Sequence, residues 1–471
     1  MTQAVQILPQ ESKYNQELVN NVHPPQWQNP TPDGRYNLVI IGAGSAGLVA
    51  AAGTAGIGGK VALIEKGYMG GDCLNIGCVP SKAVIRSGHV MAEILDAAKY
   101  GINVDGHVTA DFAQVMERMR SVRADIAPHD SARRYTDMGV DVYFGAGKFT
   151  GKNTIEVEGQ TLEFSKALIA TGSHPFVIPF EGLEETGYLT NETVFNLTEQ
   201  PERLAVIGGG PIGVELAQSF QRLGTEVTLI DISDHILPRE DADAAELVQQ
   251  SLLKDGVTLL LGAKTQRITT ERGDKIIFYE KDGQADSIAV DEILVAVGRR
   301  PNVNGLNLES AGVDYDKRGI KVNDYLQTSN PNIYAAGDVA VKYQFTHVAG
   351  QSGAIVVQNA LFPAPKRKFS DLIIPWVTYT DPEVAHVGIY PSEAAEQGIE
   401  IDTYTQKMAK VDRAVAEGDT AGFVKIHTKK GTDKILGATI VTKHAGEMIN
   451  EITLAMKHNL GLGSLASLIH P

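Results

Sequence analysis

The sequence contains only two cysteines in 471 residues. This scarcity excludes a disulfide-stapled scaffold and any zinc or iron–sulfur site built from cysteines alone. The twelve histidines permit a histidine metal site, but no HExxH pattern occurs. The chain also has fewer basic than acidic residues, 42 against 57, so its formal charge is −15. Nucleic acid and anionic membranes are therefore not expected as main partners.

The chain has no segment that we expect to target it or to cross a membrane. Residues 1–16 lack the basic start and the apolar stretch of a signal peptide. The longest uncharged run, Leu38 to Gly59, is long enough to span a bilayer, but it is rich in glycine and has a better explanation below. We therefore expect no membrane partner and a cytoplasmic location.

Composition and length predict a globular protein of several domains. The chain is 43% hydrophobic and 21% charged, which excludes global disorder, and its length suggests about three domains. Residues 1–34 hold five of the 20 prolines and show no hydrophobic periodicity. They predict an irregular arm on the surface with Trp27 as a packing anchor, and a loose tail is the alternative.

The first strong motif follows a short β-branched run, Tyr36 to Ile41, which is typical of a buried parallel strand. A GxGxxG loop comes next, with glycines at 42, 44 and 47, followed by an alanine-rich helix and a second strand that ends at Glu65. Glycines allow a tight turn and close approach to a pyrophosphate, and the helix start supplies amide donors. This unit predicts a dinucleotide site in which Glu65 accepts hydrogen bonds from a ribose.

The same unit occurs a second time. Strand 203–207 leads into glycines 208, 210 and 213, and strand 225–231 ends at Asp231. Two dinucleotide units in one chain indicate electron passage between two cofactors. Asp231 would bond a free 2′-hydroxyl and repel a 2′-phosphate, so we favour NADH over NADPH. The alternative is an exposed strand end at Asp231, with Arg239 reaching a phosphate.

Both cysteines lie in one segment, GGDCLNIGCVPSK, as Cys73 and Cys78. Five residues of regular helix advance about 7.5 Å, which exceeds the usual separation of bridged cysteines. A disulfide here needs a distorted turn, which Gly77 can provide. A bridge across so short a loop adds little stability, which favours a redox role over a structural one. Two buried free thiols or half of a metal site are the alternatives.

These motifs resemble those of the FAD-dependent pyridine nucleotide–disulfide oxidoreductases, over residues 36 to 471. The resemblance rests on the cysteine segment, the ATGS turn at 170–173, GRRPN at 298–302 and TSNPNIYAAGD at 328–338. It implies an α/β protein with two Rossmann-like dinucleotide-binding domains and a C-terminal α+β dimerisation domain. We expect an N-terminal arm at 1–34, an FAD-binding domain at 35–180 completed by 301–345, an NAD-binding domain at 181–300 and an interface domain at 346–471. The last implies a homodimer.

The resemblance also assigns roles to individual residues. Cys78 would be the thiolate beside the flavin, and Cys73 would be the thiol that attacks the substrate. Lys82 and Glu215 would pair beside the flavin ring. Asp338 would bind the ribityl chain of FAD. The full set of expected cofactor-binding residues is Gly42, Gly44, Ser45, Ala46, Gly47, Glu65, Lys66, Gly71, Asp72, Thr171, Gly172, Gly208, Gly210, Gly213, Asp231, Gly298, Arg299, Gly337 and Asp338.

The C-terminal end leaves the acid–base residue open. In many members of this family a His-Pro dipeptide of the partner subunit supplies the acid–base group at the thiols. Here the sequence ends at SLIHP, so His470 is a candidate catalytic base. The spacing after the preceding Leu-Ala-Ser run favours the alternative, in which His470 is an earlier member of a longer motif and the base lies beyond Pro471.

The function expected from these residues is an NAD(P)H oxidoreductase that passes electrons through FAD to Cys73–Cys78. The acceptor would be a small-molecule disulfide or a soft metal ion. The segments GGDCLNIGCVPSK and YTDPEVAHVG resemble those of the mercuric-reductase-like branch of the family more than those of glutathione reductase. The expected preference for NADH fits dihydrolipoamide dehydrogenase. An NADH-driven quinone or oxygen reductase and a non-catalytic NAD(H) redox sensor are the alternatives.

Overall fold

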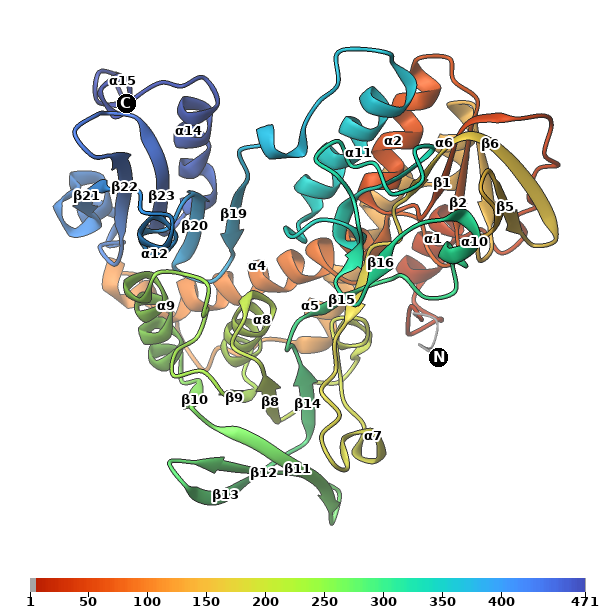
Figure 1. Cartoon of the computed structure of the whole chain (residues 1–471). Helices are drawn as coiled ribbons and strands as arrows, with labels where there is room; N and C mark the ends of the chain where they lie inside the picture. Colours follow the sequence, from red (N-terminus) through yellow and green to blue (C-terminus); the bar gives the residue numbers. More distant parts are fainter. Residues whose placement is uncertain (1–5, 471) are drawn as a thin grey trace.

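The computed structural model describes residues 6–470 and contains three sheet-based regions (Figure 1). The first sheet has the order β3-β2-β1-β6-β5-β4, with β18 paired to β6. Its strands are β1 (Tyr36–Ile41), β2 (Val61–Glu65), β3 (Val140–Phe144), β4 (Lys148–Gly151), β5 (Thr154–Val157), β6 (Gln160–Ile169) and β18 (Ile333–Ala335). The β1–β2, β1–β6, β2–β3 and β6–β18 pairs are parallel, so the loops after these strands meet at one edge of the sheet.

Helices cover this sheet and carry the cysteines. They are α2 (Ser45–Gly56), α3 (Gly71–Asn75), α4 (Cys78–Leu95), α5 (Phe112–Ile126), α6 (Ala132–Asp137) and α11 (Thr346–Leu361). Figure 1 shows α11 beside α2, although some 300 residues separate them in the chain. Val348 and Ile355 of α11 share one core with Leu38 and Ile40 of β1. The segment that we predicted to open the interface domain is therefore packed on the first sheet. Its small residues allow close contact with α2, since Gly353 lies against the backbone of Ala46.

The second region repeats the parallel arrangement. Its sheet has the order β10-β9-β8-β14, with β8 (Arg203–Ile207), β9 (Glu226–Asp231), β10 (Thr258–Leu261) and β14 (Glu292–Val295). Helices α8 (Pro211–Arg222) and α9 (Ala242–Asp255) belong to it, and an antiparallel sheet of β11 (Lys264–Glu271), β12 (Asp274–Lys281) and β13 (Gln284–Val290) extends from it. Strands β7 (Ser173–Pro175) and β15 (Arg299–Pro301) pair where the chain passes between the two regions.

The C-terminal region is an antiparallel sheet covered by a helix. Its order is β19-β20-β23-β22-β21, with β19 (Pro375–Thr378), β20 (Glu383–Gly388), β21 (Ile401–Lys407), β22 (Phe423–Lys429) and β23 (Ile435–Thr442). Helices α12 (Pro391–Glu396), α13 (Asp412–Glu417), α14 (Ala445–Lys457) and α15 (Leu462–Ala466) complete it. Glu240 fastens the second region to it, accepting hydrogen bonds from Trp376 at 3.0 Å and Tyr390 at 2.6 Å.

The N-terminal arm is not irregular as the sequence predicted, because it contains helix α1 (Lys13–Val22). Asn15, Leu18 and Val22 are buried on one face of this helix at the i, i+3, i+7 spacing. The sequence shows no clear hydrophobic periodicity here because only two of these three residues are apolar. Trp27 does anchor the arm, since its indole donates to the carbonyl of Val142 at 3.1 Å.

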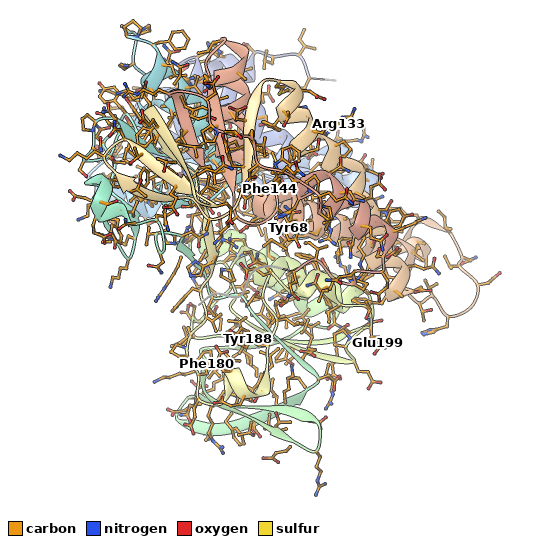
Figure 2. The ribbon with its side chains drawn as sticks, turned by 90° about the vertical axis from the view of Figure 1, so that its right-hand side faces the viewer. Tyr68, Arg133, Phe144, Phe180, Tyr188 and Glu199 are labelled. Atoms are coloured by element: carbon orange, nitrogen blue, oxygen red, sulfur yellow. The ribbon has the colours of Figure 1, made fainter. Side chains whose placement is uncertain are left out.

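The arm also reaches the strand ends of the first sheet. The ring of His23 lies 4.3 Å from that of Phe144 and 5.9 Å from that of Tyr68. Figure 2 shows Tyr68 and Phe144 close together at this end of the sheet, far from Phe180 and Tyr188 of the second region. The arm therefore covers the edge of the domain that carries the cysteines.

In the described part of the chain, residues 6–470, no helix is both long and apolar enough to cross a membrane.

Candidate functional site

The two cysteines lie on either side of a helix break. Helix α3 ends at Asn75 and α4 begins at Cys78, with Gly77 between them in a conformation outside the helical region. A Cβ atom at Gly77 would lie 2.8 Å from the carbonyl oxygen of Asp72, so a side chain does not fit here. The turn that the sequence required at Gly77 is present, and it brings the Cys73 and Cys78 side chains within hydrogen-bond distance as free thiols.

The surroundings of the pair make the two sulfur atoms chemically different. The hydrogen bond from Cys73, together with the Thr346 hydroxyl at 3.1 Å and the charge of Lys82, lowers the pKa of Cys78 to about 6. The hydrogen bond to Cys78 and burial raise the pKa of Cys73 above its ordinary value. In the reduced pair these shifts favour negative charge on Cys78 and the proton on Cys73; the roles that the resemblance implies for the two cysteines remain predictions.

An ion pair from two helices lies next to Cys78. Lys82 on α4 contacts Glu215 on α8 at 2.8 Å. Glu215 is buried and also accepts a hydrogen bond from the Tyr379 amide at 2.8 Å, and the ammonium lies 4.5 Å from the Tyr379 ring. Burial opposes the charged form of Lys82, but Glu215 outweighs it and the pKa of Lys82 is raised. A permanent cation is thus held beside the redox pair, where it stabilises negative charge.

The first glycine loop fits the pyrophosphate of a dinucleotide. Gly42 has φ +106°, and its Cβ would lie 2.2 Å from the Ala170 carbonyl oxygen, while a Cβ at Gly47 would lie 1.8 Å from the Gly42 carbonyl oxygen. These two glycines are needed for backbone packing. Gly44 has only the Cα of Gly71 within 4 Å, so its face stays open at the start of α2 for a ligand to approach the amides.

Glu65 and Asp231 occupy equivalent positions beside the two loops. Glu65 accepts hydrogen bonds from the amides of Ala43 and Gly67 at 2.8 and 2.7 Å. Burial raises the pKa of this carboxyl above its ordinary value. Asp231 likewise accepts from the amides of Gly209 and Ser233 at 2.5 and 2.7 Å. Each acid is therefore held against its glycine loop by backbone donors, at the place where a ribose of the bound dinucleotide would lie.

In the second glycine loop, too, two glycines are needed for backbone packing and one leaves open space. Gly208 has φ +115° and its Cβ would lie 2.5 Å from the Ala296 carbonyl oxygen. A Cβ at Gly213 would lie 1.9 Å from the Gly208 carbonyl oxygen. Nothing lies within 4 Å of a Cβ at Gly210, so this glycine leaves space in front of α8. The chain therefore has two loops with room for a dinucleotide pyrophosphate.

The remaining predicted cofactor residues gather at the carboxyl ends of the parallel strands. They come together through a polar network in which Ser173 donates to Asp338 at 2.7 Å and Arg299 donates to Ser173 at 2.8 Å and to Asp72. Asp338 thus lies where an extended polar ligand that crosses the strand ends would pass. The set comprises Ser45 and Ala46 at the start of α2, Lys66 after β2, Gly71 and Asp72 in α3, Thr171 and Gly172 after β6, Gly298 and Arg299 at β15, and Gly337 after β18.

Sequence reasoning missed a buried arginine that supports the end of helix α3, the helix that carries Cys73. Arg123 of α5 is fully buried and donates to the Asn75 carbonyl at the end of α3 at 2.7 Å. Its other terminal nitrogen donates to Asn15 of the N-terminal arm at 2.9 Å. Among residues 6–470 no carboxylate forms an ion pair with it, and burial lowers the pKa of Arg123 to about 10. No local pattern could identify this group, because its partners lie 48 and 108 residues away.

His470 is not among the residues that contact the cysteines of its own chain. It lies 3.1 Å from Glu451 of α14 and is exposed, in the C-terminal region. Figure 1 shows this end of the chain beside α14 and α15. Its assignment as catalytic base remains a prediction, one that requires a partner subunit.

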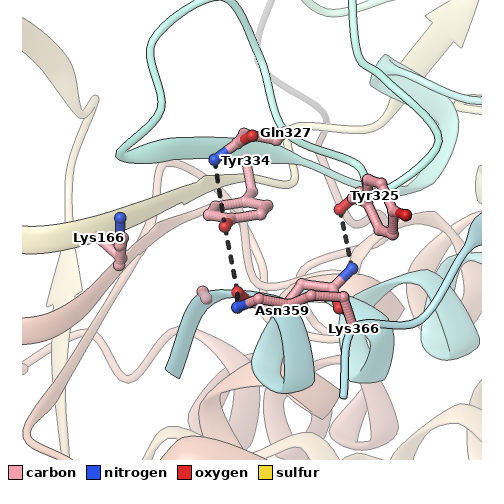
Figure 3. A pocket seen from close by; sticks show the side chains of 7 residues that line it. Lys166, Tyr325, Gln327, Tyr334, Asn359 and Lys366 are labelled. Atoms are coloured by element: carbon pink, nitrogen blue, oxygen red, sulfur yellow. Dashed lines mark hydrogen bonds between the residues drawn. The ribbon is translucent and has the colours of Figure 1, made fainter. Parts of the chain in front are cut away.

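A separate cavity of about 270 Å³ lies away from this site (Figure 3). It is near Asn359 at the C-terminal end of α11, whereas Thr346 at the other end contacts Cys78. Thirteen residues of helix place the two about 20 Å apart. Lys366 in this cavity donates to the carbonyls of Asn359 and Phe362, as a cation that caps a helix C-terminus does. The cavity is lined by Lys166, Tyr325, Gln327, Tyr334, Asn359, Ala360 and Lys366, and contains no redox-active side chain.

Comparison with known proteins agrees with this geometry. Residues 36–353 match the pyridine nucleotide-disulphide oxidoreductase family and residues 374–471 match the dimerisation domain of that family, which supports a homodimer. The chain is 39% identical to a mercuric reductase of Staphylococcus aureus over 440 residues, covering 93% of this chain and 80% of the relative. It is 35% identical to a dihydrolipoyl dehydrogenase of Chlamydia muridarum, covering 92% and 93%.

A solved structure shares the same arrangement. The HOCl-induced flavoprotein disulfide reductase RclA from Escherichia coli matches with a TM-score of 0.82 and 30% identity, over 93% of this chain and 96% of that one. The chain therefore shares its overall fold with this reductase over most of its length. The chain belongs to the pyridine nucleotide-disulphide oxidoreductase family.

Proposed function

We propose that the protein uses NADH to reduce a soft metal ion, with Hg(II) as the first candidate, through the Cys73–Cys78 pair. The observation that carries this is the pair itself: two thiols in contact, one acidic and one protonated, beside the ion pair of the half-exposed Lys82 with the buried Glu215. In balance, the hydride of NADH supplies two electrons, so that Hg(II) becomes Hg(0) and NAD⁺ and one proton are released.

FAD fits the first glycine loop and the strand ends that face Asp338. The chemistry that FAD would supply there is acceptance of a hydride from NADH and two-electron reduction of the disulfide. The protein's own residues position the charges and the two sulfur atoms. Lys82 and Glu215 hold a fixed charge beside the sulfur atoms, Cys78 keeps the negative charge, and Cys73 presents its sulfur to the acceptor.

The preference for NADH is part of the proposal. Asp231 is held by the Gly209 and Ser233 amides at the end of β9, where a negative charge disfavours a 2′-phosphate. The nearest cation in the following loop, Arg239, is exposed and makes no ion pair within the described residues. The proposed location is the cytoplasm, where NADH is regenerated.

The choice of a metal ion rests on the relatives. Three mercuric reductases match at 36 to 39% identity. A structure of the Escherichia coli reductase holds Cu(II), so a protein with the same fold binds a transition-metal ion. The second candidate acceptor is a lipoamide-type disulfide, favoured by relatives named dihydrolipoyl dehydrogenase that match over nearly their whole length.

The test is NADH oxidation by the FAD-loaded protein with Hg(II), in excess small thiol, with NADPH and lipoamide measured in parallel. We expect rapid Hg(II)-dependent turnover with NADH, and Cys73→Ser should remove it. Turnover with lipoamide but not with Hg(II) would replace the metal by the disulfide. Activity that survives Cys73→Ser would contradict both and indicate direct reduction of a quinone or oxygen.

A further inference from the structure

The N-terminal arm lies outside the part of the chain that matches the family, because that match begins at residue 36. The second half of the arm, residues 22–29, is nevertheless bound at one place, the edge of the first sheet where β2 and β3 end. Figure 2 shows Phe144 and Tyr68 close together at this edge. The contacts made there indicate what the arm does for the cofactor site.

Two neighbouring residues of the arm hold the loop that follows β2. The amide of Met69 donates to the carbonyl of Val22 at 3.0 Å. Nδ1 of His23 lies 2.5 Å from the carbonyl oxygen of Gly67, and since a carbonyl only accepts, this nitrogen carries the proton. Within residues 6–470 neither the Met69 amide nor the Gly67 carbonyl has another hydrogen-bond partner. Because Met69 is fully buried, its amide would be left unsatisfied without the arm.

The same loop is bonded to the acid of the first dinucleotide unit. The amide of Gly67, the residue whose carbonyl binds His23, donates to one carboxylate oxygen of Glu65 at 2.7 Å. The other oxygen of Glu65 accepts from the amide of Ala43 in the glycine loop at 2.8 Å. Gly70 completes the connection, since its amide donates to the Ala43 carbonyl at 2.9 Å. The arm is therefore joined to the glycine loop through hydrogen bonds, with Glu65 between them.

A second attachment fixes the strand beside Glu65. Strand β3 lies at the edge of the sheet, and its residue Phe144 is paired with Glu65 in the parallel register. The side-chain amide of Asn29 donates to the Phe144 carbonyl and accepts from the Phe144 amide, both at 2.8 Å. Trp27 donates to the carbonyl of Val142 on the same edge. The arm thus satisfies the free backbone groups of this edge strand and holds β3 against β2.

The ring of His23 connects the two attachments. It lies 4.3 Å from the ring of Phe144, the residue that Asn29 holds, while its Nδ1 binds the loop at Gly67. The ring of Trp27 packs on Phe144 from another side, at 5.7 Å and nearly perpendicular. Loss of the His23 contact would therefore loosen the loop and the strand end on both sides of Glu65.

These contacts lie at the nucleotide end of the expected FAD site. Glu65 is the acid expected to bind a ribose, because it ends the second strand of the first unit. The cysteines, by contrast, lie beyond this loop, in and after helix α3. The arm can therefore determine how firmly the cofactor is held without touching the redox pair.

We propose that residues 22–29 form a clasp that retains FAD, in which His23 is a positioning residue. By fixing Gly67, His23 holds Glu65 in its ribose-binding position and slows release of the cofactor. This rests on FAD as the cofactor of the proposed function, but not on the acceptor that the protein reduces.

The test measures FAD release, which needs no turnover. The FAD-loaded protein is diluted to nanomolar concentration, and the rise of flavin fluorescence gives the dissociation rate constant. His23→Phe keeps a ring against Phe144 but removes the donor, and we expect about three- to tenfold faster release, as for the loss of one hydrogen bond. His23→Asn places an N–H donor at the position of Nδ1 and should release FAD more slowly than the phenylalanine variant. Asn29→Ala removes the second attachment and should also speed release.

His107→Phe is the matched control, because it makes the same change at an exposed histidine in the loop before α5. The free energy of unfolding of each variant is measured with and without FAD. The clasp predicts a larger loss in the FAD-loaded form, because weaker binding removes part of the stabilisation that a ligand gives.

Two results would overturn the proposal. The first is an equal loss of stability with and without FAD, which would mean that the arm only stabilises the fold. The second is a native rate of FAD release in both His23→Phe and Asn29→Ala. Neither result depends on Hg(II) or lipoamide turnover, so a failure of the proposed acceptor is distinguishable from a failure of the clasp.

Discussion

The hydroxyl of Thr346 offers the sharpest test of how the acidic thiol is made. It is 3.1 Å from the Cys78 sulfur and belongs to the first residue of α11. Thr346→Val removes the hydrogen-bond donor with little change of shape, and Thr346→Ser keeps the donor. Comparison of these two variants therefore isolates the hydrogen bond from the packing of the side chain.

The expected size follows from the chemistry of the contact. A hydrogen bond to a charged group contributes about 1.5–3 kcal/mol, or about one to two pKa units. Because Cys78 is exposed, we take the lower figure, which moves its pKa from about 6 to about 7. At pH 7 the thiolate fraction then falls from roughly nine-tenths to roughly one-half.

The direction of the pH dependence follows from the same shift. The pKa of Cys78 lies below that of a free thiol, so the contacts that stabilise its thiolate are present at higher pH. They are lost as the pH falls through about 6 in the native protein and through about 7 in Thr346→Val.

The assay is the pH profile of Cys78 alkylation in the reduced protein, measured on native protein, Thr346→Val and Thr346→Ser. We expect only the valine variant to shift. A valine variant with the native midpoint, or a serine variant with the same shift as valine, would refute the reasoning.

Three further predictions follow from contacts elsewhere. Asn15→Ala leaves the buried guanidinium of α5 short of one acceptor and should cost about 1–3 kcal/mol, seen as a lower melting temperature; Asn20→Ala, on the exposed face of α1, should not differ from native. Gly213→Ala should destabilise or unfold the second region, because the added Cβ collides with the backbone, whereas Gly210→Ala should fold normally but raise the KM for NADH about tenfold. Equal stability of the two variants would contradict the loop geometry. Asp231→Ser should reduce the ratio of kcat/KM for NADH to that for NADPH by tenfold or more, and an unchanged ratio would show that this carboxylate does not select the nucleotide.

Much of the fold follows from patterns that are local in the sequence. The strand at 36–41 and the strand at 203–207 lie where the hydrophobic runs predicted them. Their glycine loops follow at once, because a tight turn from strand to helix needs positive φ at Gly42 and Gly208. The cysteine segment is equally local, since the helix breaks at Gly77, where a Cβ would collide with the carbonyl oxygen of Asp72.

The failed prediction for the arm has a physical cause. Helix α1 buries two apolar residues and one asparagine, so its hydrophobic stripe is too short to detect. Asn15 is buried because it accepts a hydrogen bond from Arg123, a partner 108 residues away. The sequence of the arm contains no information about that partner, and its helix is stabilised by tertiary packing.

By itself, then, the sequence predicted which residues do the redox chemistry and hold the dinucleotides, because these functions need short motifs with set spacing. The tertiary structure alone decided the electrostatics. The lower pKa of Cys78 depends on its hydrogen bond with Cys73 of α3, on Thr346 of α11 and on Lys82 of α4, groups on separate elements. Coulomb energies depend on distance in space, and only the folded chain brings these groups together.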